Sequence, residues 1–134
     1  HEDLHISLSI EEPLISLGEN PVLRFEAVNT GTTAISLPGE VVSDSGKLAL
    51  KGRTSLLFAS VRGSSIKDQV RLGGRRPIRR SKPGEQVIGP GERMVWKAAF
   101  EWGDYGKKPG KYQIVWRCGK TASLPVVYEI REKQ

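Results

Sequence analysis

Apolar and polar residues alternate along most of this chain, and the alternation is its strongest structural signal. In residues 93–102 one parity is apolar or aromatic throughout, and the other is mostly polar. Successive side chains of a β-strand point to opposite faces, so this pattern predicts a strand with one buried face. A helix would instead repeat its apolar residues three and four positions apart.

The same alternation predicts strands elsewhere along the chain. The segments that carry it are residues 4–10, 23–27, 55–62, 66–72, 112–118 and 126–130. Turn signals rich in glycine, proline and asparagine separate them. The pattern predicts about eight or nine strands and no helix, so we expect an all-β protein.

The last third of the chain reads as three consecutive strands joined by short turns. Such a meander needs a second sheet to cover its apolar face. A chain of 134 residues is large enough for one domain with its own core. We therefore expect a single domain over residues 1–134, folded as a sandwich of two antiparallel sheets.

Two short motifs in this last third resemble those of a known fold. Residues 89–92 read Gly-Pro-Gly-Glu, and about one strand later residues 109–112 read Pro-Gly-Lys-Tyr. The spacing resembles the closing half of immunoglobulin-like and fibronectin-like sandwiches. In those folds a tyrosine near the start of the penultimate strand often bonds back to the preceding loop. The resemblance implies an immunoglobulin-like fold with Tyr112 in that role.

The spacing is also similar to that of bacterial proteinase-inhibitor-like domains of the intracellular type. Both motifs are short and occur in unrelated sandwiches. They therefore predict a fold, and they predict a function only by analogy.

The net charge of the chain lies in one segment. The chain has 21 Lys and Arg against 15 Asp and Glu, a net charge of +6. Residues 71–82 hold six basic residues and no acidic one, so 15 residues of each sign remain elsewhere. The six are Arg71, Arg75, Arg76, Arg79, Arg80 and Lys82. Gly73-Gly74, which precede five of the six, and Pro83-Gly84 after them predict an exposed basic loop at residues 71–84.

Clustered arginines suit a polyanion, because the guanidinium fork matches phosphate and sulfate geometry. The alternative is a solvated loop that keeps the domain soluble. The sequence argues against nucleic acid as the partner, because no stacking aromatic lies between Phe58 and Trp96. A further alternative is a proteinase inhibitor that presents residues 76–80 as bait in an exposed loop.

Aromatic residues near a second turn suggest another alternative, a carbohydrate-binding module. Tyr105 lies in the turn at residues 103–108, and Trp102 lies at the end of the preceding strand. Trp96 shares its parity with the apolar residues of that strand, so we expect it in the core.

No catalytic or metal-binding motif is present in the sequence. It has no G-x-S-x-G, P-loop, HExxH or CxxC pattern. His1 and His5 are the only histidines, and in an extended chain they would lie about 13 Å apart. We therefore expect no enzyme, no catalytic residues, no metal and no cofactor. The lone Cys118 excludes an internal disulfide, and we expect it to pack as a small buried strand residue.

These features together predict a non-catalytic binding or accessory module with a protein or polyanionic partner. No apolar run reaches the length of about 18 residues that a membrane span needs. We expect a bacterial protein that is secreted or part of the cell envelope, in the extracellular space or the periplasm, although the sequence leaves a cytoplasmic location open. Because the chain begins with His1, we expect a processed product, a fragment or a tag remnant.

Overall fold

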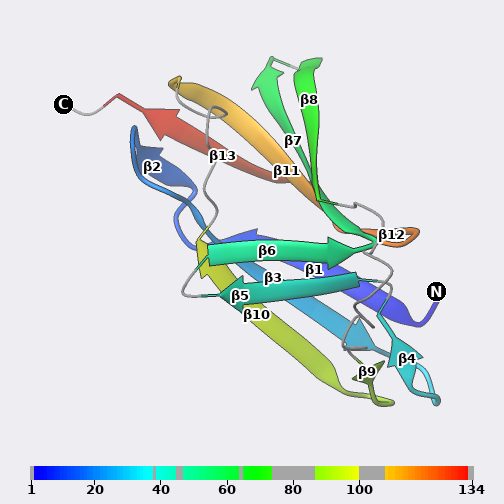
Figure 1. Cartoon of the computed structure of the whole chain (residues 1–134). Coiled ribbons are helices and arrows are strands. Elements are labelled where there is room, and N and C mark those ends of the chain that lie inside the picture. The colour runs from blue at the N-terminus through cyan, green and yellow to red at the C-terminus, as the bar shows by residue number, and fades with distance from the viewer. Residues whose placement is uncertain are drawn as a thin grey trace.

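The computed structural model describes residues 2–37, 39–44, 47–63, 65–73, 87–99 and 108–132. All the regular structure in these residues is β-strand, and they contain no helix (Figure 1). The prediction of an all-β protein is confirmed. None of the described segments forms a helix long and apolar enough to cross a membrane.

Thirteen strands are found in the described residues, and nine of them are six residues or longer. The first seven are β1 (Leu4–Ile10), β2 (Leu14–Ser16), β3 (Val22–Asn29), β4 (Ile35–Ser36), β5 (Gly39–Asp44), β6 (Lys47–Gly52) and β7 (Thr54–Arg62). The others are β8 (Ser65–Gly73), β9 (Val87–Ile88), β10 (Arg93–Ala99), β11 (Gly110–Cys118), β12 (Thr121–Ala122) and β13 (Val126–Arg131).

The strands form two larger sheets and one small one. The five-stranded sheet has the order β1-β3-β10-β6-β5, and the six-stranded sheet has the order β2-β13-β11-β7-β8 with β12 paired to β11. Strands β4 and β9 pair with each other. Most pairs are antiparallel, but β2 pairs with β13 and β6 with β10 in parallel. The parallel β2 follows from a change of sheet at Pro13, which cannot donate a ladder hydrogen bond.

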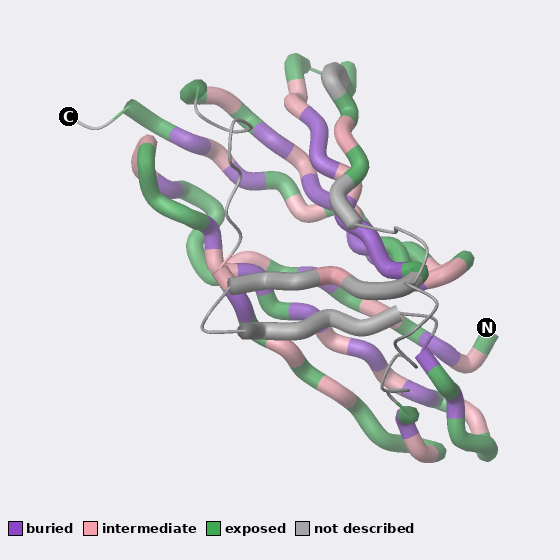
Figure 2. Tube along the Cα trace, in the orientation of Figure 1, coloured by how far each residue is buried: buried purple, intermediate pink, exposed green. Residues whose placement is uncertain are grey.

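Side chains from both larger sheets meet in one core. Phe25 of β3 and Trp116 of β11 lie edge to face, with ring centroids 5.1 Å apart. Trp96 packs edge-on against Trp116 at 6.2 Å, in agreement with its expected place in the core. Buried residues alternate with more exposed ones along β3 and β11 (Figure 2), as the sequence pattern requires. The buried Cys118 also agrees with the sequence prediction.

Tyr112 ties the start of β11 to the loop before it. Its hydroxyl donates a hydrogen bond to the carbonyl oxygen of Lys108 at 2.5 Å, and its ring stacks on Phe58 at 5.1 Å. This is the bond that the resemblance implied for Tyr112. Burial raises the pKa of its phenol above the usual value.

Candidate functional site

One end of the six-stranded sheet gathers residues that are far apart in the sequence. Strand β7 begins where β8 and β11 end, because Ser55 pairs with both Gly73 and Arg117. Figure 1 shows β12 beside these converging strand ends. Four exposed cationic residues lie here, and we call them the basic end: Arg53, Arg71, Arg117 and Lys120.

Hydrogen bonds within the backbone and core hold this end of the sheet in place. The Thr54 hydroxyl accepts a hydrogen bond from the Trp116 indole at 2.7 Å and donates one to the Arg117 carbonyl at 3.1 Å. The Gly119 amide donates to the Arg53 carbonyl at 2.8 Å. Gly119 has a φ of 62°, which a glycine adopts without strain in the turn between β11 and β12. The backbones that carry these cations are therefore anchored to the core.

The strand register places Arg71 and Arg117 on the same outer face of the sheet. Arg71 pairs with Leu57, and Arg117 pairs with Ser55, two residues away on the same strand. Strand spacings and the rise per residue put their Cα atoms about 12 Å apart. Their long side chains can therefore contact neighbouring groups of one extended anion.

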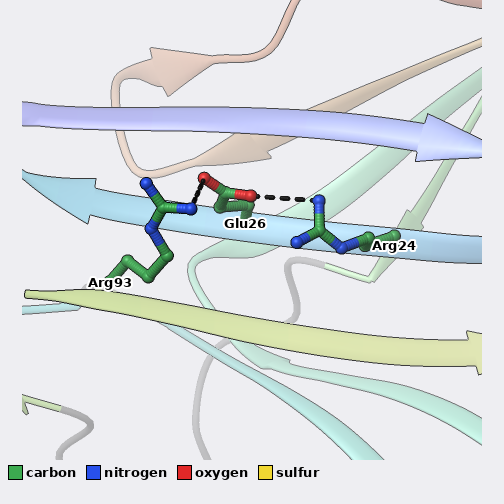
Figure 3. Close-up of polar contacts among 3 residues, drawn as sticks. All are labelled: Arg24, Glu26 and Arg93. Carbon is green, nitrogen blue, oxygen red and sulfur yellow. Dashed lines mark ion pairs between the residues drawn. The ribbon is translucent and has the colours of Figure 1, made fainter.

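The cations of the basic end differ in pairing from those on the outer face of the five-stranded sheet. Within the described part of the chain, no ion pair involves Arg53, Arg71, Arg117 or Lys120. On the five-stranded sheet, the Glu26 carboxylate forms ion pairs with the guanidinium groups of Arg24 at 3.1 Å and Arg93 at 3.5 Å (Figure 3). Lys97 likewise pairs with Glu11. That face is an exposed network of both signs, whereas the four cations of the basic end form no ion pair with other described residues.

The predicted basic loop begins at this same end. Arg71 lies on β8 and is exposed, and β8 ends at Gly73. The other five residues predicted for this site lie outside the described residues: Arg75, Arg76, Arg79, Arg80 and Lys82. Sequence reasoning missed Arg53, Arg117 and Lys120, because only long-range strand pairing brings them beside β8. The sequence near them offers only a preceding glycine as a signal, Gly52 before Arg53 and Gly119 before Lys120.

A groove lies at the opposite end of the six-stranded sheet. It has a volume of about 880 Å³, and β2, the start of β11 and the end of β13 line it. Its polar side chains are Ser16, Glu129, Arg131 and Glu132. Strand β11 spans nine residues between the two ends, so they lie about 27 Å apart.

The position of the predicted aromatic site relative to this groove is not part of the described structure. Trp102 and Tyr105 lie outside the described residues. The described chain resumes at Lys108, and the next two residues, Pro109 and Gly110, line the groove. Among the described residues, no group of three or more His, Cys, Asp or Glu is arranged to hold a metal ion.

Comparison with known proteins finds structures with a similar fold, but it does not assign the chain to a family. No protein-family model matches the chain, and a search of curated proteins gives no match. The chain is similar to part of the Pseudomonas fluorescens alkylpurine DNA glycosylase AlkC bound to DNA containing an abasic site analog. The TM-score is 0.59 at 14% identity, over 96% of this chain and 30% of that one.

Two β-glucosidases are also similar over part of their length. The enzyme EmGH1 from Erythrobacter marinus gives a TM-score of 0.56 at 13% identity, over 96% of this chain and 15% of that one. The Listeria innocua enzyme in complex with glucose gives 0.52 at 11% identity, over 95% and 16%. The chain thus spans less than a third of each of these proteins, and what it shares with them is the fold of that part.

Proposed function

We propose that this chain is a non-catalytic accessory domain with an immunoglobulin-like sandwich fold. The core shared by the two larger sheets supports this fold, as does the hydrogen bond from Tyr112 to Lys108. The change of sheet between β1 and β2 leaves β2 parallel to the last strand, which fits the same architecture. The similar structures match this fold as 15–30% of much longer bacterial proteins, which supports an accessory role.

We infer that the domain binds a polyanion at its basic end. The observation that carries this inference is the group of four exposed cations that form no ion pair with other described residues. Five more cations follow in residues 74–82, directly after β8. Phosphate or sulfate groups would form charge-assisted hydrogen bonds with the arginine guanidinium groups. Clustered charge of one sign also raises the rate of encounter with such a partner.

The test is elution from heparin in a salt gradient, with three variants beside the wild type. One variant changes Arg53, Arg117 and Lys120 to serine, and a second changes Arg75, Arg76, Arg79 and Arg80 to serine. The control changes Arg62, Lys108 and Lys111 to serine, which removes the same charge as the first variant from exposed positions at the far end of the sheet.

The wild type and the control should elute well above physiological salt, and both other variants should elute much earlier. Loss of three contacts should lower the slope of log affinity against log salt by about 2 to 3. Equal elution of the control and the first variant would mean that binding to heparin depends only on net charge, and it would refute a polyanion site at the basic end.

A second candidate function is carbohydrate binding at the groove. Its volume of about 880 Å³ suits a small ligand, and its polar side chains could hydrogen-bond sugar hydroxyls. Glucose and laminaribiose, the sugars named in two of the similar β-glucosidase structures, are suitable first probes.

The proteinase-inhibitor hypothesis rests on residues 76–80, outside the described residues, and is tested by assaying trypsin-like proteases at micromolar concentrations of the domain.

A further inference from the structure

The two larger sheets end in four edge strands, and one of them lacks the usual protection. Strand β2 is only three residues long. Strands β5 and β8 contain charged residues, and the pairing of β8 is also shifted by an irregularity opposite β7. Strand β1 is seven residues long and contains neither charge nor proline. Natural sheets usually protect long edges with charge, proline or bulges. In β1 the charged residues lie only at its flanks, at Glu2, Asp3, Glu11 and Glu12, so its seven central residues can pair.

The backbone of β1 presents free hydrogen-bonding groups on its open side. The Thr30 amide donates to the Asp3 carbonyl, and the Glu11 amide donates to the Val22 carbonyl. Hydrogen bonding alternates along an antiparallel pair, so the odd-numbered residues of β1 direct their backbone groups toward β3. The even-numbered residues therefore direct their amides and carbonyls to the open edge: Leu4, Ile6, Leu8 and Ile10. Among the described residues, no strand pairs with this edge.

We propose that β1 pairs antiparallel with β1 of a second copy of this chain, across a two-fold axis at Ser7. In this register Leu4 faces Ile10 of the second copy, and Ile6 faces Leu8 of the second copy. In each copy, all four residues whose amides and carbonyls face the open edge then lie opposite a residue of the second copy whose amide and carbonyl also face that edge. Shifting the register by two residues in either direction leaves fewer of them paired, so this register makes the most hydrogen bonds.

The side chains fit this symmetric pairing as well as the backbone does. On the core face, apolar residues meet apolar residues, and Ile6 and Ile10, which are only partly buried, gain cover. On the outer face His5 meets Ser9 of the second copy, and Ser7 meets its own equivalent. Within residues 4–10 no like charges meet. Just beyond them the same register sets Asp3 opposite Glu11 and Glu2 opposite Glu12 of the second copy, and Glu11 is already paired with Lys97 of its own chain. A self-complementary strand favours a second copy over an unrelated partner, because a two-fold interface uses the same surface twice.

The test is the molecular mass in solution, measured by sedimentation equilibrium over a wide range of protein concentration. The wild type should reach twice the chain mass of 14.8 kDa. Ser7→Lys should weaken the dimer about fivefold, because it puts two lysines directly opposite each other. The folded monomer should tolerate this change, since Ser7 is exposed and lies opposite Glu26 of β3.

Val95→Lys is the matched control. Val95 also lies opposite Glu26, but on the inner strand β10, so this lysine meets the same carboxylate away from the open edge. It should leave the dimer unchanged. A chain that stays monomeric up to about 1 mM would overturn the proposal, as would a dimer equally sensitive to both lysines.

A pair of double variants tests the register itself. His5→Lys with Ser9→Lys should weaken the dimer about tenfold or more, because it creates two facing lysine pairs. His5→Glu with Ser9→Lys creates two facing ion pairs instead and should keep or tighten the dimer. Both doubles place a lysine opposite Arg24 of the same chain, so that cost is common to them. Equal dimerisation of the two doubles would refute this pairing.

Discussion

Two tyrosines lie against each other inside the six-stranded sheet, and both are held in their neutral form. Tyr112 and Tyr128 are direct partners across β11 and β13, with ring centroids 5.8 Å apart. Burial raises the pKa of Tyr128 far above its usual value, and the neighbouring Tyr112 raises it further. The folded state therefore keeps both phenol protons at a pH where an unfolded chain loses them.

This difference predicts a loss of stability in alkali. An unfolded tyrosine releases its proton near pH 10, and above that pH the unfolded state binds fewer protons than the folded state. Each buried tyrosine should then lower the free energy of unfolding by about 1.4 kcal/mol per pH unit. Tyr128→Phe should remove one such contribution above pH 10 and leave the pH dependence between 7 and 9 unchanged. Urea unfolding at pH 8 to 11 measures both slopes, and identical alkaline slopes would contradict the prediction.

At the scale of single residues, the sequence predicted those roles that depend on local pattern. The alternation along the strand was enough to predict that Cys118 is buried, and the Pro-Gly-Lys-Tyr motif implied the hydrogen bond of Tyr112. The sequence could not predict the basic end, because Arg53 and Arg117 become neighbours only when β7 pairs with β11. Nothing local to either residue reveals that pairing.

At the scale of elements, one buried residue joins β3 to β9 and to the turn that leads into β10. Asn29 ends β3, and its amide nitrogen donates to the carbonyl of Thr33 at 2.8 Å and to that of Ile88 in β9 at 3.0 Å. Its side-chain oxygen accepts a hydrogen bond from the Gly31 amide at 2.9 Å. Its backbone also exchanges hydrogen bonds with Gly91 and Glu92 at the entry to β10. This corner therefore depends on Asn29 for its polar contacts.

Asn29→Ala should destabilise the domain by about 3 kcal/mol, because it leaves buried backbone groups without partners. Asn29→Asp is the sharper variant. It keeps the oxygen that accepts from Gly31, but it turns a carboxylate toward two carbonyls, so the folded pKa of that Asp should rise. Its stability should therefore approach the wild-type value near pH 4 and fall as the pH rises to 7. Urea unfolding at both pH values tests this, and a pH-independent loss would argue against the amide as the essential donor.

The sequence located elements well wherever one face is buried. It placed β1 at residues 4–10, and it came within two residues of both ends of β3 and β7. The very short β2 was not recognised, because its pairing with β13 depends on the change of sheet after Pro13 and not on alternation. The predicted strand at 93–102 is described as far as Ala99, and its last residues lie outside the described part.

At the scale of the whole molecule, the six-stranded sheet separates the two candidate binding surfaces. The basic end and the groove lie at opposite ends of β11, about 27 Å apart. The charge distribution in the sequence pointed to the basic end through Arg71, but the groove and its distance from the basic end follow only from the strand register. At this distance substitutions at the two ends share no partners, so their effects should add.

This separation predicts that the two candidate functions can be removed one at a time. Glu129→Gln with Arg131→Ser should leave elution from heparin unchanged, because the net charge stays the same, and it should abolish any change in tryptophan fluorescence on addition of laminaribiose. Arg117→Ser with Lys120→Ser should do the reverse, with earlier elution and an unchanged sugar response. A variant that carries all four changes should show both losses at the size seen in each pair. If either pair alters both measurements, the two ends are coupled through the sheet or form one site, and the assignment of separate surfaces would be wrong.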